Sequence, residues 1–201
     1  MILIGIDMSK NSPGVCINDN GELFFKSFYR GNPSKKERKN FDLFENSNNL
    51  SVNYNKNKRP SKMEYEVQER WNILDAIQCA SNILENLPLE ADYIGLEGFS
   101  YGSKGNAGLD IAGYAYVLRQ KLVERYGAEK LYIFSPAEIK KNAGKGNAGK
   151  ELMLEYFIGI KDESNKLREY ILDGLIDTTE KPIDDIIDAY WIQELLKTKV
   201  K

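Results

Sequence analysis

The order of strand and helix signals at the start of the chain limits its fold more than any other feature. Residues 2–7 form an apolar run that ends in Asp7, and further apolar runs follow at 15–17 and 23–29. Asp19-Asn20-Gly21 separates the last two runs, and Asn-Gly readily takes the positive φ angles of a tight hairpin turn. The pattern predicts three strands joined as an antiparallel meander.

Helix and strand patterns alternate after this meander. Apolar residues spaced by multiples of three and four predict an amphipathic helix from about residue 63 to 87, stopped by Pro88. The residues that define its apolar face are Met63, Val67, Leu74, Ile77, Leu84 and Leu87. Strands are predicted at 93–96 and 131–134, and helices at 109–126, 136–142, 150–158 and from 183 onward. The linker 161–181 is predicted to hold a helix and a turn.

A meander that leads into parallel strands implies one α/β domain over residues 1–201. Its sheet would be mixed and five-stranded, with three antiparallel strands followed by two parallel ones, and helices would cover both faces. With 42% hydrophobic and 29% charged residues, the composition is ordinary for a globular chain with one sizeable core.

Residues 30–62 differ from the rest, because they are rich in Asn and Lys and poor in aliphatic side chains. From Lys26 to Lys62 there are ten basic and three acidic residues, although the whole chain has a net charge of −2. This composition predicts a loop or flexible arm inserted into the domain. The insertion is either a solvated surface segment or an arm that follows a DNA backbone. In the second case Lys35, Lys36, Arg38 and Lys39 would contact phosphates, and Tyr29, Phe41, Phe44 and Tyr54 could stack on bases.

The chain contains no histidine. This excludes Ser-His-Asp and Cys-His catalysis and every His-ligated metal site. Cys16 and Cys79 are too few for a structural zinc site, and we expect both to be reduced in the core. Any metal must therefore be held by carboxylates, which favours Mg²⁺ or Mn²⁺. We see neither a signal peptide nor an apolar run long enough to cross a bilayer, so we expect a cytoplasmic protein without a membrane partner.

Two glycine motifs in the chain do not carry the chemistry that their patterns suggest. Residues 98–102 fit the nucleophile elbow G-x-S-x-G, but that chemistry needs a histidine base. Residues 144–150 resemble a phosphate-binding P-loop, but Glu151 stands where Ser or Thr must ligate Mg²⁺, and the loop follows a predicted helix instead of a strand. We therefore expect no nucleotide cofactor.

Carboxylates stand at positions where they could meet at one site. Asp7 and Glu97 each end an apolar predicted strand, and Asp185 and Asp188 project from one face of the last helix. If the two strands are parallel neighbours, their carboxylates emerge together at the carboxyl edge of the sheet, where α/β folds place ligands. Each residue also has a structural interpretation: Asp7 could cap a turn, Glu97 could lie on the surface, and the aspartates could favour the helix N-terminus. Taken together, the residues predict a divalent-metal site.

Four segments of the chain resemble the RuvC family of Holliday-junction resolvases, which belong to the RNase H-like superfamily; the bacteriophage-encoded relatives are the most similar. The segments are Ile4-Gly-Ile-Asp7, Gly95-Leu-Glu97, the stretch 135–150 (SPAEIKKNAGKGNAGK) and Asp185-Ile-Ile-Asp188-Ala189. They run from end to end of the chain except for residues 30–62. The most specific are the lysine- and glycine-rich stretch and the Asp-x-x-Asp-Ala spacing.

The resemblance implies an RNase H-like fold and a homodimeric crossover junction endodeoxyribonuclease that makes paired symmetric nicks in a four-way DNA junction. Two Mg²⁺ ions, for which Mn²⁺ could substitute, would activate water and stabilise the leaving 3′ oxygen. The implied metal ligands are Asp7, Glu97, Asp185 and Asp188. Lys150 would stand beside the scissile phosphate, and Lys140, Lys141 and Lys145 would line the DNA backbone. Phe99 and Tyr101 lie in the loop after Glu97, where the family carries an aromatic residue at the junction centre, and Lys104 would also bind DNA.

Other interpretations stay open at this stage. A nuclease of the same fold could act on flaps, forks or RNA–DNA hybrids, and a module could bind branched DNA without cutting it. A chain of 201 residues is too short for the duplicated fold of an actin-like kinase. Asp184 could pair with Asp188 in place of Asp185, although the Asp-x-x-Asp-Ala spacing favours Asp185. The insertion departs from the bacterial relatives.

Overall fold

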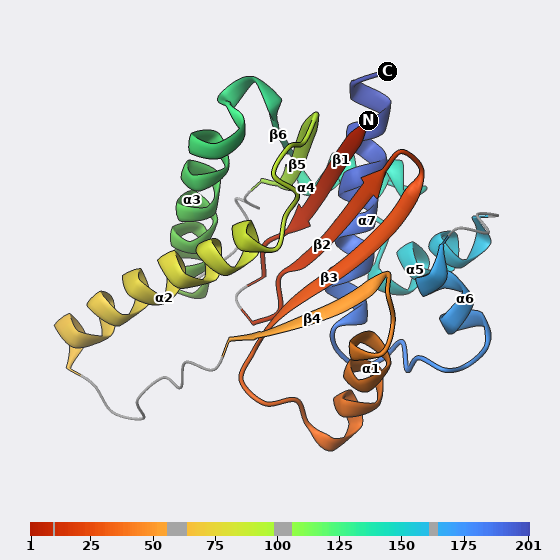
Figure 1. The fold of residues 1–201 in the computed structure, drawn as a ribbon, viewed down its shortest axis with the longest axis horizontal. Helices are drawn as coiled ribbons and strands as arrows, with labels where there is room; N and C mark the ends of the chain where they lie inside the picture. Colours follow the sequence, from red (N-terminus) through yellow and green to blue (C-terminus); the bar gives the residue numbers. More distant parts are fainter. Residues whose placement is uncertain (10, 56–63, 99–105, 161–164) are drawn as a thin grey trace.

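A computed structural model describes residues 1–201 except 10, 56–63, 99–105 and 161–164. One mixed sheet forms its centre, with helices on both faces (Figure 1). The strands are β1 (Ile2–Asp7), β2 (Gly14–Asp19), β3 (Glu22–Arg30), β4 (Leu50–Asn55), β5 (Tyr93–Glu97) and β6 (Leu131–Phe134). The helices are α1 (Lys35–Glu45), α2 (Tyr65–Glu85), α3 (Asn106–Tyr126), the 3₁₀ turn η1 (Ala128–Lys130), α4 (Pro136–Asn142), α5 (Lys150–Gly159), α6 (Lys166–Leu172) and α7 (Ile183–Lys199).

The predicted meander is confirmed. β1 pairs antiparallel with β2, and β2 pairs antiparallel with β3. Asn20 and Gly21 both have positive φ angles, 52° and 104°, as the hairpin between β2 and β3 requires. β5 and β6 then add in parallel beside β1, so the predicted order of three antiparallel and two parallel strands is present.

The sheet has six strands, and the prediction of five was wrong because β4 lies in the inserted segment. β4 pairs in parallel with β3 and covers what would otherwise be an open edge of the sheet. Leu50 of β4 is buried, and Leu50, Val52 and Tyr54 alternate with polar residues as a strand requires. The high Asn and Lys content of the insertion hides this short alternation in the sequence.

The prediction that the insertion is a loop or flexible arm was also wrong over residues 35–55. Ser34 and Glu37 form a reciprocal capping box that starts α1. Phe41 and Phe44 are fully buried, so they are not available to stack on bases, and Tyr29 packs against Phe41 with ring centroids 4.7 Å apart. The aromatic side chains that composition assigned to DNA instead anchor the insertion to the body; that of Tyr54 is outside the described side chains.

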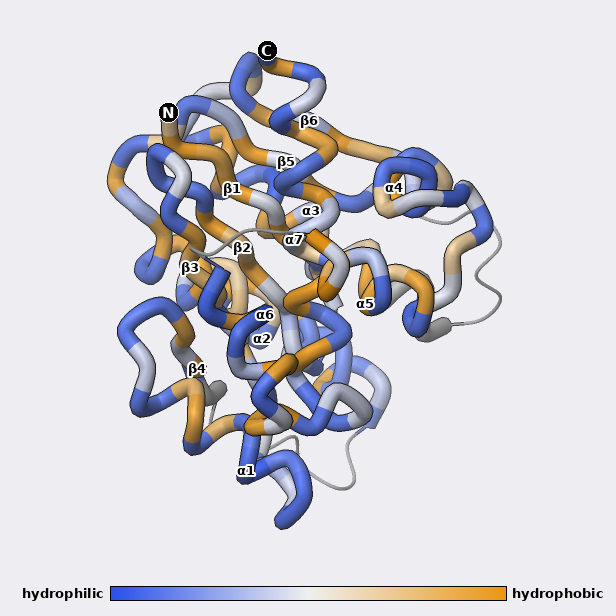
Figure 2. The backbone as a smooth tube through the Cα atoms, turned by 90° about the vertical axis from the view of Figure 1, so that its right-hand side faces the viewer, coloured by the Kyte–Doolittle hydropathy of each residue, from blue (hydrophilic) through white to orange (hydrophobic). Residues whose placement is uncertain are grey.

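Two hydrophobic clusters lie on opposite faces of the sheet. On one face Ile4, Ile6 and Val15 pack against α2 and α3, and on the other Leu3, Cys16 and Phe25 pack against α7 and α5. Figure 2 shows hydrophobic stretches along the strands and a largely hydrophilic α1. Cys16 and Cys79 are both free and buried, one in each cluster, which confirms the expectation for the two thiols. Of the helices that the structure describes, none is long and apolar enough to cross a membrane.

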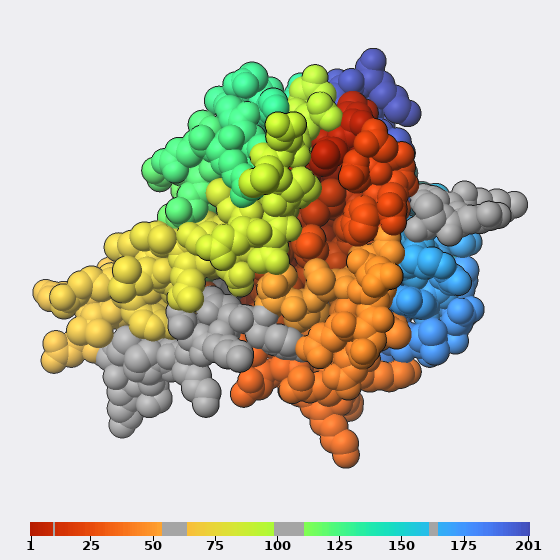
Figure 3. Space-filling view, viewed as in Figure 1, coloured from red at the N-terminus to blue at the C-terminus, as the bar shows by residue number. Residues whose placement is uncertain are grey.

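The predicted apolar face of α2 is confirmed only at its C-terminal end, where Leu84 and Leu87 pack into the core. Val67, Leu74 and Ile77 are exposed, whereas the inward face is lined by the small residues Ala76 and Ala80; Met63 lies outside the described residues. Small side chains let α2 approach α3 closely, so hydrophobicity alone did not identify the packed face. The N-terminal half of α2 stands out from the body in Figure 3. Its outer face carries several exposed apolar residues. These are Val67, Ile73, Leu74 and Ile77, called the outer α2 face below.

A buried ion pair joins the insertion to these helices. Arg30, the last residue of β3, pairs with Asp75 of α2 and donates a hydrogen bond of 2.6 Å to the hydroxyl of Tyr114 on α3. The Asp75 side chain is 1% exposed, and it also accepts a hydrogen bond from Tyr114. Arg30 therefore has a structural role inside the molecule, although composition counts it with the basic insertion.

Candidate active site

Asp7 and Glu97 lie together at the carboxyl edge of the sheet. β1 and β5 are parallel neighbours with Ile6 opposite Leu96, so the next residue of each strand is one of these two carboxylates. Their side chains interact directly, and a hydrogen bond between them requires a proton on one of the two carboxyl groups. The sequence-based expectation that two strand-terminal carboxylates emerge side by side is therefore met.

Helix α7 brings Asp185 to the same edge through close backbone contact with the sheet. A Cβ atom on Gly14 would lie 2.2 Å from the Asp185 carbonyl oxygen, and one on Gly5 would lie 2.2 Å from the Ala189 carbonyl oxygen. These glycines are needed because a side chain at either position would push α7 away. Since Gly14 is the register partner of Asp7, the contact sets Asp185 beside Asp7.

The carboxylates interact strongly with one another. Burial raises the pKa of Asp7 well above its usual value, and the charges of Asp188, Asp185 and Glu97 raise it further. Burial raises the pKa of Asp188 to about 7, although the charge of Lys150 opposes this rise. The charges of Glu97, Asp185 and Asp184 add to the rise. Burial also raises the pKa of Glu97, against the opposing charge of Lys140. The carboxylates grouped at this edge therefore repel one another, and a bound cation would reduce this repulsion.

The structure separates the roles of Asp184 and Asp185. Asp185 is 4% exposed and faces Asp7. Asp184 is half-buried and forms ion pairs with Lys150 and Lys181. Although its burial opposes ionisation, hydrogen bonds from these two lysines lower the pKa of Asp184. The placement thus favours Asp185 over Asp184 as the partner of Asp7.

The donor set suits a hard divalent cation, because it consists of four carboxylates from β1, β5 and α7. Within the described parts of the chain, no three His, Cys, Asp or Glu side chains are arranged so that they could hold a metal ion at once. The Asp185 Oδ2 atom is directed to other partners: Ser12 donates a hydrogen bond to it, and the Lys181 Nζ atom lies 2.6 Å away. Neither Ser12 nor Lys181 was predicted from the sequence, since both reach the site from loops.

The predicted lysines border this edge. Lys150 is the first residue of α5, and its exposed side chain forms an ion pair with Asp184. Burial works against its charge, but the hydrogen bond and charge of Asp184 raise the pKa of Lys150. Lys140 and Lys141, in the last turn of α4, and Lys145, in the loop after it, are exposed. The sequence predicted the start of α4 correctly, since Ser135 and Glu138 form its capping box.

The other predicted DNA-binding residues fall into two groups. Lys35, Lys36, Arg38 and Lys39 are exposed on α1, so they are placed on a folded helix instead of a flexible arm. Phe99, Tyr101 and Lys104 lie outside the described residues, and their roles remain predictions.

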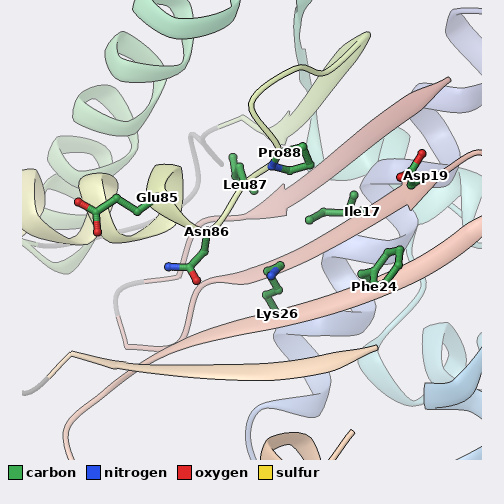
Figure 4. A pocket seen from close by; sticks show the side chains of 8 residues that line it. All are labelled: Ile17, Asp19, Phe24, Lys26, Glu85, Asn86, Leu87 and Pro88. Atoms are coloured by element: carbon green, nitrogen blue, oxygen red, sulfur yellow. The ribbon is translucent and has the colours of Figure 1, made fainter. Parts of the chain in front are cut away.

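Two hollows have different relations to the carboxylates. One of about 330 Å³ borders them between α5 and the start of α7, and its lining includes Lys150, Thr179, Asp184 and Asp188. The other, of about 430 Å³, lies on the sheet face of β2 and β3 (Figure 4). Burial lowers the pKa of Lys26 in this second hollow, which contains none of the four clustered carboxylates.

Comparisons with known proteins gave structural matches alone. No protein-family model and no curated protein matches the chain. Thermus thermophilus RuvC is 12% identical, with 99% of this chain and 96% of that chain covered and a TM-score of 0.47. The structure of T. thermophilus RuvC in complex with a Holliday junction substrate is 9% identical, with 100% of this chain and 96% of that chain covered and a TM-score of 0.47. Fowlpox virus resolvase in complex with Holliday junction DNA is 14% identical over 100% of both chains, with a TM-score of 0.49.

Proposed function

We propose that this chain is a metal-dependent DNA endonuclease that resolves four-way junctions, a crossover junction endodeoxyribonuclease of the RuvC kind. The observation that carries the proposal is the meeting of Asp7, Glu97, Asp185 and Asp188 at one sheet edge bordered by lysines. A module that only binds DNA would gain nothing from carboxylates that face phosphates. Bound by these four residues, two Mg²⁺ or Mn²⁺ ions would supply an activated water and stabilise the leaving 3′ oxygen of an in-line displacement.

The remaining residues have roles that do not depend on histidine. Lys150 can hold its ammonium group near a phosphate bound at the carboxylates and stabilise the charge of the transition state. Lys140, Lys141 and Lys145 form an exposed basic stretch that can follow the DNA backbone beside the site. Lys35, Lys36, Arg38 and Lys39 on α1 provide a second stretch.

A panel of labelled substrates tests this proposal. The purified chain is incubated with Mg²⁺ and, in turn, a mobile four-way junction, a Y-fork, a 5′ flap, an RNA–DNA hybrid and a plain duplex. Paired symmetric nicks in the junction are expected. Cutting mainly of flaps, forks or hybrids would keep the metal chemistry and change the substrate. Junction binding without cutting in Mg²⁺ or Mn²⁺ would leave a binding module and contradict the proposal.

The Lys150→Ala substitution should separate catalysis from binding. Because Lys150 stands beside the carboxylates, we expect cleavage at saturating junction to slow by about 10²-fold, while the Kd for the junction changes by less than about threefold. Lys145→Ala is the contrasting variant: Lys145 belongs to the proposed DNA-binding stretch and touches no carboxylate in the described structure, so its loss should weaken junction binding without slowing cleavage at saturating junction. Equal losses of binding and cleavage in Lys150→Ala would remove its catalytic role.

The outer α2 face is the surface we propose for a homodimer. Paired nicks in one junction need two active sites, and the described part of each chain holds one carboxylate cluster. Leu74 and Ile73 are 66% and 57% exposed on a helix that protrudes from the body (Figure 3), so a second copy of the chain can cover them.

We expect Leu74→Glu to shift the protein from dimer to monomer, measured by analytical ultracentrifugation, because it places a charge at the centre of the outer α2 face. Junction nicks should then occur singly. Leu89→Glu is the control, since Leu89 is 86% exposed between α2 and β5. A Leu74→Glu protein that stays dimeric, or a wild type that is monomeric at micromolar concentration, would show that this face is not the interface.

A further inference from the structure

Lys181 contacts two of the α7 aspartates, Asp184 and Asp185. Its Nζ atom lies 2.9 and 3.1 Å from the two Asp184 carboxylate oxygens and 2.6 Å from the Asp185 Oδ2 atom. The Asp185 side chain is 5% exposed, whereas that of Lys181 is 35% exposed. Lys181 therefore neutralises a buried carboxylate while keeping a path to solvent.

The inserted helix α1 holds the segment that carries Lys181. Asn40 of α1 is fully buried, and its Nδ2 atom donates to the carbonyl oxygens of Asp177, Glu180 and Lys181 at 2.8, 3.4 and 3.3 Å. The Asp177 backbone N–H donates back to Asn40 Oδ1 at 2.9 Å. One side chain of the insertion thus fixes both ends of the segment 177–181, immediately before α7.

We propose that Lys181 is a built-in counter-ion that competes with the divalent ion for Asp185, and that the inserted helix α1 keeps it in place through Asn40. This inference rests on the proposed function, because it assumes that Asp185 is a metal ligand. In the metal-free protein Lys181 offsets the repulsion among the carboxylates. Its flexible four-carbon stem and partial exposure allow it to leave when a divalent ion takes the same oxygen.

The ion pair between Lys181 and Asp185 differs from an ordinary exposed ion pair at the start of a helix. An exposed pair between a lysine and a carboxylate three or four residues apart contributes little. Here the Asp185 carboxylate is buried, and the same oxygen also accepts a hydrogen bond from Ser12. A metal ion that binds Asp185 must displace these contacts, so Lys181 should weaken metal affinity.

Isothermal titration of Mn²⁺ into the full-length metal-free protein tests the inference. Lys181→Met removes the charge and keeps the length of the side chain, so we expect Mn²⁺ to bind about tenfold more tightly. The melting temperature of the metal-free variant should fall, because the buried Asp185 loses its counter-ion. Lys140→Met is the matched control. The charge of Lys140 acts on the Glu97 carboxylate, and no described contact joins Lys140 to Asp184 or Asp185. We expect this control to change the Mn²⁺ affinity by less than about threefold.

The outcomes separate this inference from the proposed function. Equal gains in Lys181→Met and Lys140→Met would reduce the effect to general charge removal and overturn the inference. Unchanged or weaker Mn²⁺ binding in Lys181→Met would do the same, while the metal site itself would stand if Asp7→Asn abolished binding. A wild type that binds no Mn²⁺ would overturn the proposed metal site together with the inference.

Asn40→Ala tests the role of the insertion. With the segment 177–181 released, Lys181 should hold Asp185 less firmly, and Mn²⁺ should bind more tightly than to the wild type but less tightly than to Lys181→Met. In the double variant Asn40→Ala/Lys181→Met, the Asn40 substitution should raise the Mn²⁺ affinity by less than about twofold over that of Lys181→Met alone. Additive effects would show that Asn40 does not act through Lys181. If Asn40→Ala does not fold, as circular dichroism would reveal, the comparison of the two lysine variants decides the proposal.

Discussion

Asp7→Asn should abolish cleavage, with a loss of about 10³-fold or more in the cleavage rate of the four-way junction. Asp7 is 8% exposed and interacts with all three of the other clustered carboxylates, so its charge is central to the proposed metal site. Saturating Mn²⁺ should raise the melting temperature of the wild type by about 5–10 °C, and this rise should vanish in the variant. Single-turnover cleavage and thermal melts measure the two effects.

Asp19→Asn is the matched control for this prediction. Asp19 is also a strand-terminal aspartate, but it ends β2 at the opposite edge of the sheet, opposite Ile2, and is exposed. Both its cleavage rate and its response to Mn²⁺ should equal those of the wild type. An Asp7→Asn protein that cuts junctions at a rate near that of the wild type would overturn the metal mechanism.

Asp188→Asn should stabilise the metal-free protein at pH 8 while it destroys activity. Burial first, and then the neighbouring carboxylates, raise the pKa of Asp188 from 3.8 to about 7 in the native state. Between these values the native state keeps a proton that the unfolded chain has lost, so the stability falls as the pH rises through this window. Asparagine cannot ionise, and the variant should be more stable at pH 8 by about 2–4 kcal/mol.

Thermal melts in chelator from pH 4 to pH 8 measure this effect. The wild type and Asp188→Asn should melt at similar temperatures near pH 4 and diverge by roughly 5–15 °C at pH 8. Added Mn²⁺ should stabilise the wild type and reduce the difference. Parallel curves with a constant offset would contradict the prediction, because they would show that Asp188 does not titrate in this window.

The paired stability and activity tests have a common physical basis. Carboxylates that lie close together in the metal-free protein repel one another, and this repulsion destabilises the folded state. A divalent ion removes the repulsion when it binds. A site of this kind costs stability in the free protein. Lys181 reduces that cost for Asp185, although burial still raises the pKa of Asp185, and the pKa values of Asp7 and Asp188 are raised as well.

Local patterns in the sequence were sufficient for the meander, the parallel strands and the placement of Asp7 and Glu97. A hairpin turn depends on two residues and a buried strand on about six, so the necessary information lies within a few positions. The Asp-x-x-Asp spacing on the last helix likewise needs one turn of helix. These features reach the correct edge of the sheet because parallel neighbouring strands end at the same edge.

Contacts between distant segments were decided by the tertiary structure alone. Asn40 holds residue 177 from 137 positions away, and Ser12 reaches Asp185 from 173 positions away. The packed face of α2 depends on its close approach to α3, and the insertion folds because Phe41, Phe44 and Leu50 find a surface to cover. The sequence by itself determined which carboxylates could meet. How they meet, and which lysine they face, was decided by the packing of α7 on Gly5 and Gly14 and of α1 on the segment before α7. The physical reason is that burial and ion pairing depend on neighbours that local periodicity does not encode.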